Sequence, residues 1–224
     1  MAAVTGAAGG APEVEAGWVA EALGQELPGL ALTTLAVAAH GSHRTTRGLR
    51  ARLRTLSDRF GGARAVLLRR EPVPAAYRAF YRHVGLDPDV DRPPGEAAVL
   101  ERLLHGGFAS SDRLGDARLV AVVETGVPVY ALDEARLVGP LGLRTAGAGE
   151  RIGEGPVAPD AAPGSIVVAD AAHAVAPLFA EPPAPYAASA RTRHVRLYAP
   201  SVEGVPAIHV EEALFMVADA LVEG

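Results

Sequence analysis

The chain has 224 residues, of which 49% are hydrophobic and 21% charged, so it can bury the core of one large domain. It has no cysteine, which excludes disulfides and thiolate metal or redox sites. The start lacks a basic signal region, and no apolar run approaches the roughly 20 residues that span a bilayer. We therefore expect a cytoplasmic protein without a membrane partner. The net charge of −5 disfavours binding of polyanions through the overall field.

The N-terminal part is expected to hold a disordered tail, a helix, a strand and a second, longer helix. Residues 1–12 are rich in alanine and glycine and predict the tail. Residues 13–27 have a helical composition, and residues 30–39 form a strand-like apolar run. Ser42 is a plausible N-cap for the long helix. The buried side of the first helix is expected to carry Trp18, Leu23 and Leu27. The apolar stripe of the long helix contains Leu49, Leu53, Leu56 and Phe60.

The long helix lies in the one strongly basic region of the sequence. Nine arginines stand between residues 43 and 70 against one acid, Asp58. Arg47, Arg50 and Arg54 share a face away from the apolar stripe. Two interpretations remain open: a solvated helix face, or a contact with the backbone of tRNA.

The remaining chain predicts more helices and a group of short strands. Helices are expected over residues 74–84 and 96–105, the second with Leu100, Leu103 and Leu104 inward, while 114–123 is ambiguous. A C-terminal helix buries Val210, Leu214, Val217 and Leu221. Strands are expected over 127–132, 141–145, 165–169 and 194–198. This order favours an α+β fold, with residues 13–72 and 73–224 forming one continuous globule.

Three motifs that could carry chemistry are incomplete or absent. The glycine-rich stretch 145–155 lacks the Lys-Ser/Thr of a phosphate-binding loop. His40 and His43 have HxxH spacing but no third ligand nearby, and a zinc site needs three or four. No Gly-x-Ser-x-Gly elbow is present. The sequence therefore predicts no metal and no cofactor.

An ordered set of motifs between residues 96 and 170 is more specific. It runs EAAVLERLLHGG, RLGDARLVAVVETGVPVYALD, GPLGLRTAGAGE and PGSIVVAD. The set resembles the B3/B4 domain of the phenylalanyl-tRNA synthetase β subunit and its free-standing relatives. The resemblance implies a B3/B4-like α+β fold with a mixed, short-stranded sheet packed by helices. It also implies recognition of the aminoacylated 3′ end of tRNA, where a misattached amino acid is hydrolysed.

The resemblance also implies candidate site residues. Those that fall on family motif positions include Arg102, Asp116, Arg144 and Glu150. The substrate-binding residues predicted on this basis are Tyr130, Asp116, Thr125, Gly126, Arg102, Arg144 and Glu150. They are expected to share one cleft, although helix capping, turn geometry or ion pairing is an alternative role for most of them.

Three departures from the family pattern leave the function open. Leu119 and Tyr130 stand where the family has asparagine and histidine, and no glutamate matches the editing-site acid near residues 185–190. The chain is therefore interpreted as a trans-editing aminoacyl-tRNA deacylase or, alternatively, as a non-catalytic module that binds tRNA or a small amino-acid-like ligand. A third hypothesis is an enzyme of amino-acid metabolism. The chain is too short to be a complete ligase.

Overall fold

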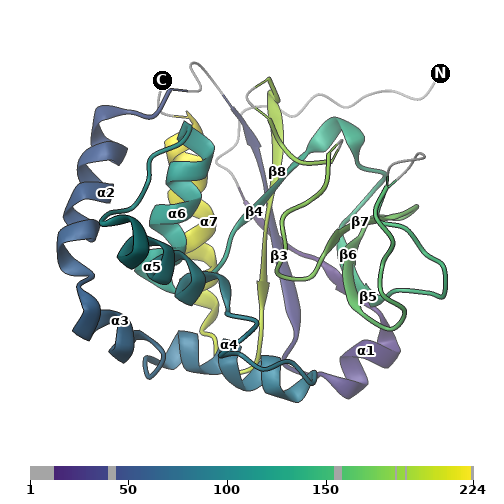
Figure 1. The fold of residues 1–224 in the computed structure, drawn as a ribbon. Helices are drawn as coiled ribbons and strands as arrows, with labels where there is room; N and C mark the ends of the chain where they lie inside the picture. The colour runs from purple at the N-terminus through teal and green to yellow at the C-terminus, as the bar shows by residue number, and fades with distance from the viewer. Residues whose placement is uncertain (1–12, 40–43, 154–157, 185, 190, 223–224) are drawn as a thin grey trace.

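The computed structural model describes residues 13–39, 44–153, 158–184, 186–189 and 191–222. The predicted tail, residues 1–12, lies outside the described residues. The protein is a mixed α+β structure in three layers, with a helical layer, a central sheet and a second sheet beyond it (Figure 1). The helices are α1 (Glu21–Glu26), α2 (Arg47–Arg59), α3 (Gly62–Leu68), α4 (Pro72–His83), α5 (Pro94–His105), α6 (Arg113–Thr125) and α7 (Ala207–Val222).

Two four-stranded sheets lie beside one another. The central sheet has the order β1-β3-β8-β4 and is antiparallel throughout, and the second has the order β2-β5-β6-β7. The strands are β1 (Val14–Ala16), β2 (Trp18–Val19), β3 (Ala31–Ala38), β4 (Tyr130–Asp133), β5 (Gly142–Thr145), β6 (Ile166–Ala169), β7 (Ala174–Pro177) and β8 (His194–Ser201). Strands from residues 13–72 thus join both sheets.

The predicted helix over residues 13–27 is wrong for its first part. Residues 14–16 pair with β3, and residues 18–19 run parallel to β5, so the helix begins only at Glu21. Gly17 allows the chain to pass between the sheets, because a Cβ there would lie 2.9 Å from the Leu141 carbonyl oxygen. The Trp18 indole donates to the Pro140 carbonyl at 3.0 Å. These non-local pairings override local helix propensity, while Leu23 and Leu27 are buried as predicted.

The long basic helix forms, but it begins later than predicted. Its N-cap is Thr46, whose hydroxyl accepts from the Leu49 N–H at 3.1 Å. Ser42, the predicted cap, lies outside the described residues. Leu53, Leu56 and Phe60 are buried against α6 and α5, which confirms the apolar stripe.

Helix α5 presents a different face from the one predicted. Leu100 and Leu104 are 36% and 74% exposed, whereas Val99 is buried. The helix begins at Pro94, and Gly95 lies close to Val122 of α6, so the contact with α6 sets which side faces inward. Apolar residues at most positions between 97 and 104 leave that choice to the neighbouring helix.

The other predicted elements agree well with the structure. Strands β4, β5, β6 and β8 overlap their predicted ranges, and the ambiguous segment 114–123 is part of helix α6. Helix α7 buries Val210, Leu214, Val217 and Leu221, as predicted. Strand β7 was not predicted. Within the described residues, no helix is both long and apolar enough to cross a membrane.

Candidate functional site

A pocket of about 470 Å³ opens between α5, α6 and the start of β4. We call it the Tyr130 pocket. Its apolar wall includes Ala97, Ala98, Leu119, Val122 and Val129. Phe179 also lines it, and four charged side chains stand around it: Arg92, Glu101, Arg118 and Glu181. A largely apolar hollow with a few polar groups is the usual form of a small-ligand site.

Tyr130 is the predicted site residue that lines this pocket. Its side chain is 3% exposed, and its ring stacks on Tyr198, with centroids 5.2 Å apart. Neither hydroxyl has a hydrogen-bond partner in the part of the chain that the structure describes. Burial is the main cause that raises the pKa of Tyr130 well above its ordinary value. The phenol therefore stays protonated at neutral pH and can donate a hydrogen bond.

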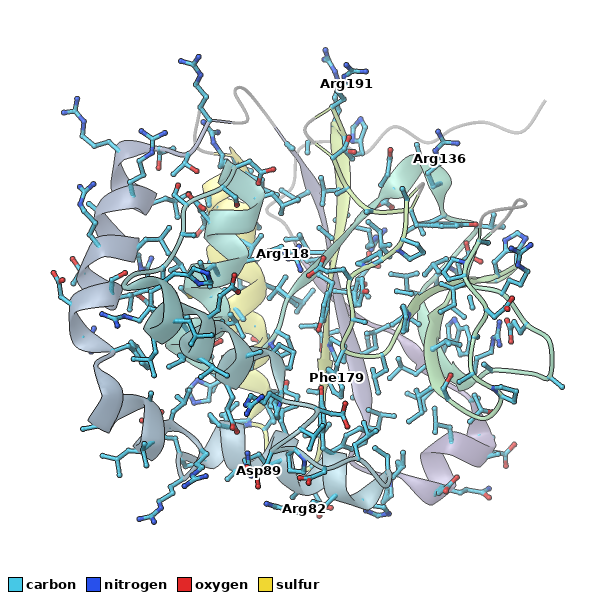
Figure 2. The ribbon with its side chains drawn as sticks, viewed as in Figure 1. Arg82, Asp89, Arg118, Arg136, Phe179 and Arg191 are labelled. Carbon is cyan, nitrogen blue, oxygen red and sulfur yellow. The ribbon has the colours of Figure 1, made fainter. Side chains whose placement is uncertain are left out.

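Arg118 connects the two sides of the pocket. Its Nε donates to the Val129 carbonyl at 2.6 Å, and its guanidinium lies 5.5 Å from the centre of the Tyr130 ring. It also forms an ion pair with Glu181. Figure 2 shows Arg118 on the side of the helical layer that faces the sheets, with Phe179 below it. The pocket thus offers two cations, two carboxylates, a phenol and an aromatic ring.

Asp116 is completely buried and hydrogen-bonded within the chain. Its carboxylate accepts from the hydroxyls of Thr45 and Ser110 at 2.5 and 2.6 Å, and from the Ser111 N–H at 2.7 Å. These bonds fasten two loops to the start of α6. Asp116 thus has a structural role at the start of α6, whose N-cap is Asp112.

Thr125 and Gly126 shape the end of α6. The Thr125 hydroxyl donates to the Ala121 carbonyl at 2.7 Å and accepts from the Val127 N–H at 3.0 Å. Gly126 has a left-handed backbone, with φ of 77°, and a Cβ there would lie 2.9 Å from Val73 Cγ1. Both residues therefore serve the turn that leads into β4.

Arg102, Arg144 and Glu150 are engaged in intramolecular contacts away from the pocket wall. Arg102 donates through Nε and Nη2 to the Ser57 carbonyl at 3.1 and 2.5 Å, which ties α5 to α2. Arg144 of β5 forms a bidentate ion pair with Glu150. The hydrogen bond from Arg144 is the main cause that lowers the pKa of Glu150 to about 2. Of the seven predicted substrate residues, Tyr130 alone lines the Tyr130 pocket, so this pocket does not bring them together.

Arg47, Arg50 and Arg54 lie exposed along the outer face of α2. None of the three forms an ion pair within the described ranges, whereas Arg52 pairs with Glu124 and Arg64 with Glu71. Helix α2 forms one side of the molecule in Figure 1. The three guanidinium groups are thus accessible to a polyanion.

Sequence reasoning missed five polar or aromatic pocket residues: Arg92, Glu101, Arg118, Phe179 and Glu181. Glu101 directly precedes the predicted Arg102, and Arg118 lies two positions after the predicted Asp116, but nothing in the local pattern separates them from solvated charges. Phe179 stands in a segment with no predicted element. Only the fold brings these positions together.

The HxxH pair, His40 and His43, lies outside the described residues. Among the residues that are described, no three His, Asp or Glu side chains group in a way that could hold a metal ion. No family model matches the chain, and no curated protein matches its sequence.

Proposed function

We propose that this protein is a B3/B4-like module that binds the aminoacylated end of tRNA and hydrolyses the ester there. The observation that carries the proposal is the Tyr130 pocket, where a buried phenol with no partner among the described residues stands beside two guanidinium groups and two carboxylates. An aminoacyl ester presents an ammonium group, an ester carbonyl and a side chain. The pocket has a complementary group for each of them.

The complementarity can be stated group by group. Glu101 and Glu181 suit the ammonium group through charge. The Tyr130 phenol would donate a hydrogen bond to the carbonyl oxygen. Nη1 of Arg118 has no partner among the described residues and would donate a second hydrogen bond to the same oxygen. The wall from α5 and α6, together with Phe179, suits an apolar or aromatic side chain.

The proposed chemistry needs no cofactor. Water attacks the ester carbonyl carbon, the bond to the ribose oxygen breaks, and the ribose oxygen takes up a proton. Donors fixed near the carbonyl oxygen would stabilise the negative charge that develops on it. Orientation of the already activated ester against water supplies a further part of the rate.

The exposed arginines of α2 supply the proposed contact with the tRNA backbone. They form a row at helical spacing on a protein whose net charge is −5, so the attraction would be local to this face. Such contacts make affinity strongly dependent on salt. Changing Arg47, Arg50 and Arg54 to glutamine should reduce the slope of log affinity against log salt by up to about 3.

One observation favours binding without hydrolysis as the second candidate. The residues that line the Tyr130 pocket include no histidine, serine or threonine, so the described wall offers only carboxylates as general bases. A module that holds an amino-acid-like ligand or charged tRNA without turnover would need no such base.

Incubation of the purified protein with a panel of mischarged tRNAs tests the catalytic proposal. We expect loss of the aminoacyl group faster than in buffer for at least one tRNA, and at least tenfold slower loss with Tyr130→Phe. No deacylation on any tRNA would end the catalytic proposal. A gel-shift titration with salt then separates the alternatives: salt-sensitive binding of tRNA supports the module, and no tRNA binding leaves a small-molecule pocket.

A further inference from the structure

Phe179 stands at the boundary between two pockets. It lines the Tyr130 pocket, and it also lines a second pocket of about 590 Å³ beside α4 and α1. We call this second one the Tyr81 pocket. Its wall is largely apolar and includes Leu23, Leu27, Phe80, Tyr81, Ile166 and Leu178. One aromatic ring thus borders both hollows.

The backbone of Phe179 has an unusual conformation. Among the described residues it is the only one other than glycine with a positive φ, at 58°. A side chain is rarely found in this left-handed region, because its Cβ crowds the backbone. Such a conformation persists where surrounding contacts determine it, and it is concentrated at functional sites.

Three aromatic side chains of helix α4 hold the ring in place. The ring stacks on Tyr81 with centroids 5.6 Å apart and meets Tyr77 and Phe80 edge-on at 5.5 and 5.7 Å. The Leu178 N–H donates to the Ile166 carbonyl at 3.0 Å, and Glu181 pairs with Arg118. The short segment from 178 to 181 is therefore fixed to β6 at one end and to α6 at the other.

We propose that Phe179 is a partition that limits the length of the group that the Tyr130 pocket accepts. While the ring is present, a ligand side chain that enters past Tyr130 meets the face or edge of Phe179. Without the ring, the hollow continues into the apolar Tyr81 pocket. A two-ring side chain would then fit where a single ring fits in the native protein.

The ligand class in this inference rests on the proposed function, but the partition itself does not. The aminoacyl probes are therefore L-phenylalanine amide, with one ring, and 4-phenyl-L-phenylalanine amide, with two. The third probe is 4-hydroxybiphenyl, which has neither an ammonium nor a carbonyl group. Affinities for the full chain are measured by calorimetry or by NMR titration.

Phe179→Gly is the main variant, because it removes the ring and also suits the left-handed backbone. We expect the native protein to bind the one-ring amide at least tenfold more tightly than the two-ring amide. In Phe179→Gly this preference should disappear or invert. Phe179→Leu keeps much of the bulk and should stay near the native preference. Phe108→Ala, which removes an aromatic ring that lines neither pocket, is the control.

The possible failures are distinguishable. If neither amide binds to any of the proteins, the aminoacyl ligand class is wrong, and 4-hydroxybiphenyl tests the partition alone. At least tenfold tighter binding of this probe to Phe179→Gly than to the native protein supports the partition, and equal binding overturns it. An unchanged preference for the one-ring amide in folded Phe179→Gly also overturns it. Should Phe179→Gly not fold, Phe179→Trp tests the partition by enlarging the side chain instead of removing it. That variant should weaken binding of the smallest probe that binds the native protein, and unchanged binding would refute the partition.

Discussion

Asp116 and Tyr130 are both buried polar residues that were predicted to bind substrate, yet their surroundings differ completely. The Asp116 carboxylate receives hydrogen bonds from Thr45, Ser110 and Ser111. The Tyr130 hydroxyl neither accepts nor donates a hydrogen bond among the described residues. The chain itself satisfies the Asp116 carboxylate, whereas it leaves the buried Tyr130 hydroxyl unpaired among the described residues.

The difference shows how to separate a structural polar group from one available to a ligand. An unpaired buried hydroxyl costs free energy, commonly about 1–3 kcal/mol, so a fold tends to provide a partner. Where the partner is missing beside a pocket, a ligand can supply it. Burial alone would have ranked Asp116 and Tyr130 equally, and a match to the family motif would have favoured Asp116.

The largest expected effect comes from Asp116. Asp116→Ala would leave the hydroxyl of Thr45, the hydroxyl of Ser110 and the Ser111 N–H without their acceptor, and two loops would detach from α6. We expect the free energy of unfolding to fall by about 3–4 kcal/mol. Urea denaturation followed by circular dichroism measures it. Asp58→Ala, at an exposed position of α2, should change stability by less than about 0.5 kcal/mol. A well-folded Asp116→Ala that lost only ligand binding would reverse the assignment of this residue.

The glycine at the end of α6 gives the next largest effect. Gly126→Ala would force a side chain into the left-handed region and against Val73 at 2.9 Å, so we expect a loss of about 2–3 kcal/mol. Gly85 is a matched control, because its φ is similar at 82° but no atom lies within 4 Å of the added Cβ. Gly85→Ala should cost about 1 kcal/mol. Equal losses in thermal unfolding would show that the contact with Val73 has no role.

A pair of tyrosines sharpens the comparison at Tyr130. Tyr130→Phe removes a hydroxyl without a partner, so stability should stay constant or rise by up to about 1 kcal/mol while deacylation or ligand affinity falls at least tenfold. Tyr77→Phe removes an equally buried hydroxyl that donates to the Pro200 carbonyl at 2.9 Å. This variant should lose about 1–2 kcal/mol of stability and keep its function. If both variants behaved alike, the Tyr130 hydroxyl would have no special role.

The sequence predicted the elements that bury one continuous face. The apolar stripes of α2 and α7 and the strand β3 are read from local periodicity. Strands β1 and β2 have three and two residues, and only pairing with β3 and β5 makes them strands. The face of α5 was mispredicted because its neighbour decides it.

For the site, the motif order led to Tyr130 but not to the residues around it. Arg118 lies 12 positions before Tyr130, and Phe179 lies 49 positions after it. No local pattern joins these three positions, because the pocket is made by the packing of α6, β4 and the segment that follows β7. Whether a motif residue is already hydrogen-bonded within the chain also depends on distant partners, as Thr45 shows for Asp116.

The smallest expected effect concerns the Arg144–Glu150 ion pair, a third motif site that the chain closes on itself. The hydrogen bond from Arg144 and the Gly147 N–H lower the pKa of Glu150 from 4.5 to about 2. Because its pKa is depressed, the ionised Glu150 carboxylate stabilises the fold above the unfolded-state pKa, and this contribution is lost as the pH falls from about 5 to 2.

Because the pair is partly exposed, we expect Glu150→Gln to cost only about 1 kcal/mol at pH 7. The difference in free energy of unfolding between the variant and the native protein should shrink in acid, as measured by denaturant titration across that range. Glu13→Gln, at an exposed position, controls for loss of one surface carboxylate. A difference that stayed constant down to pH 2 would show that Glu150 contributes through something other than its charge.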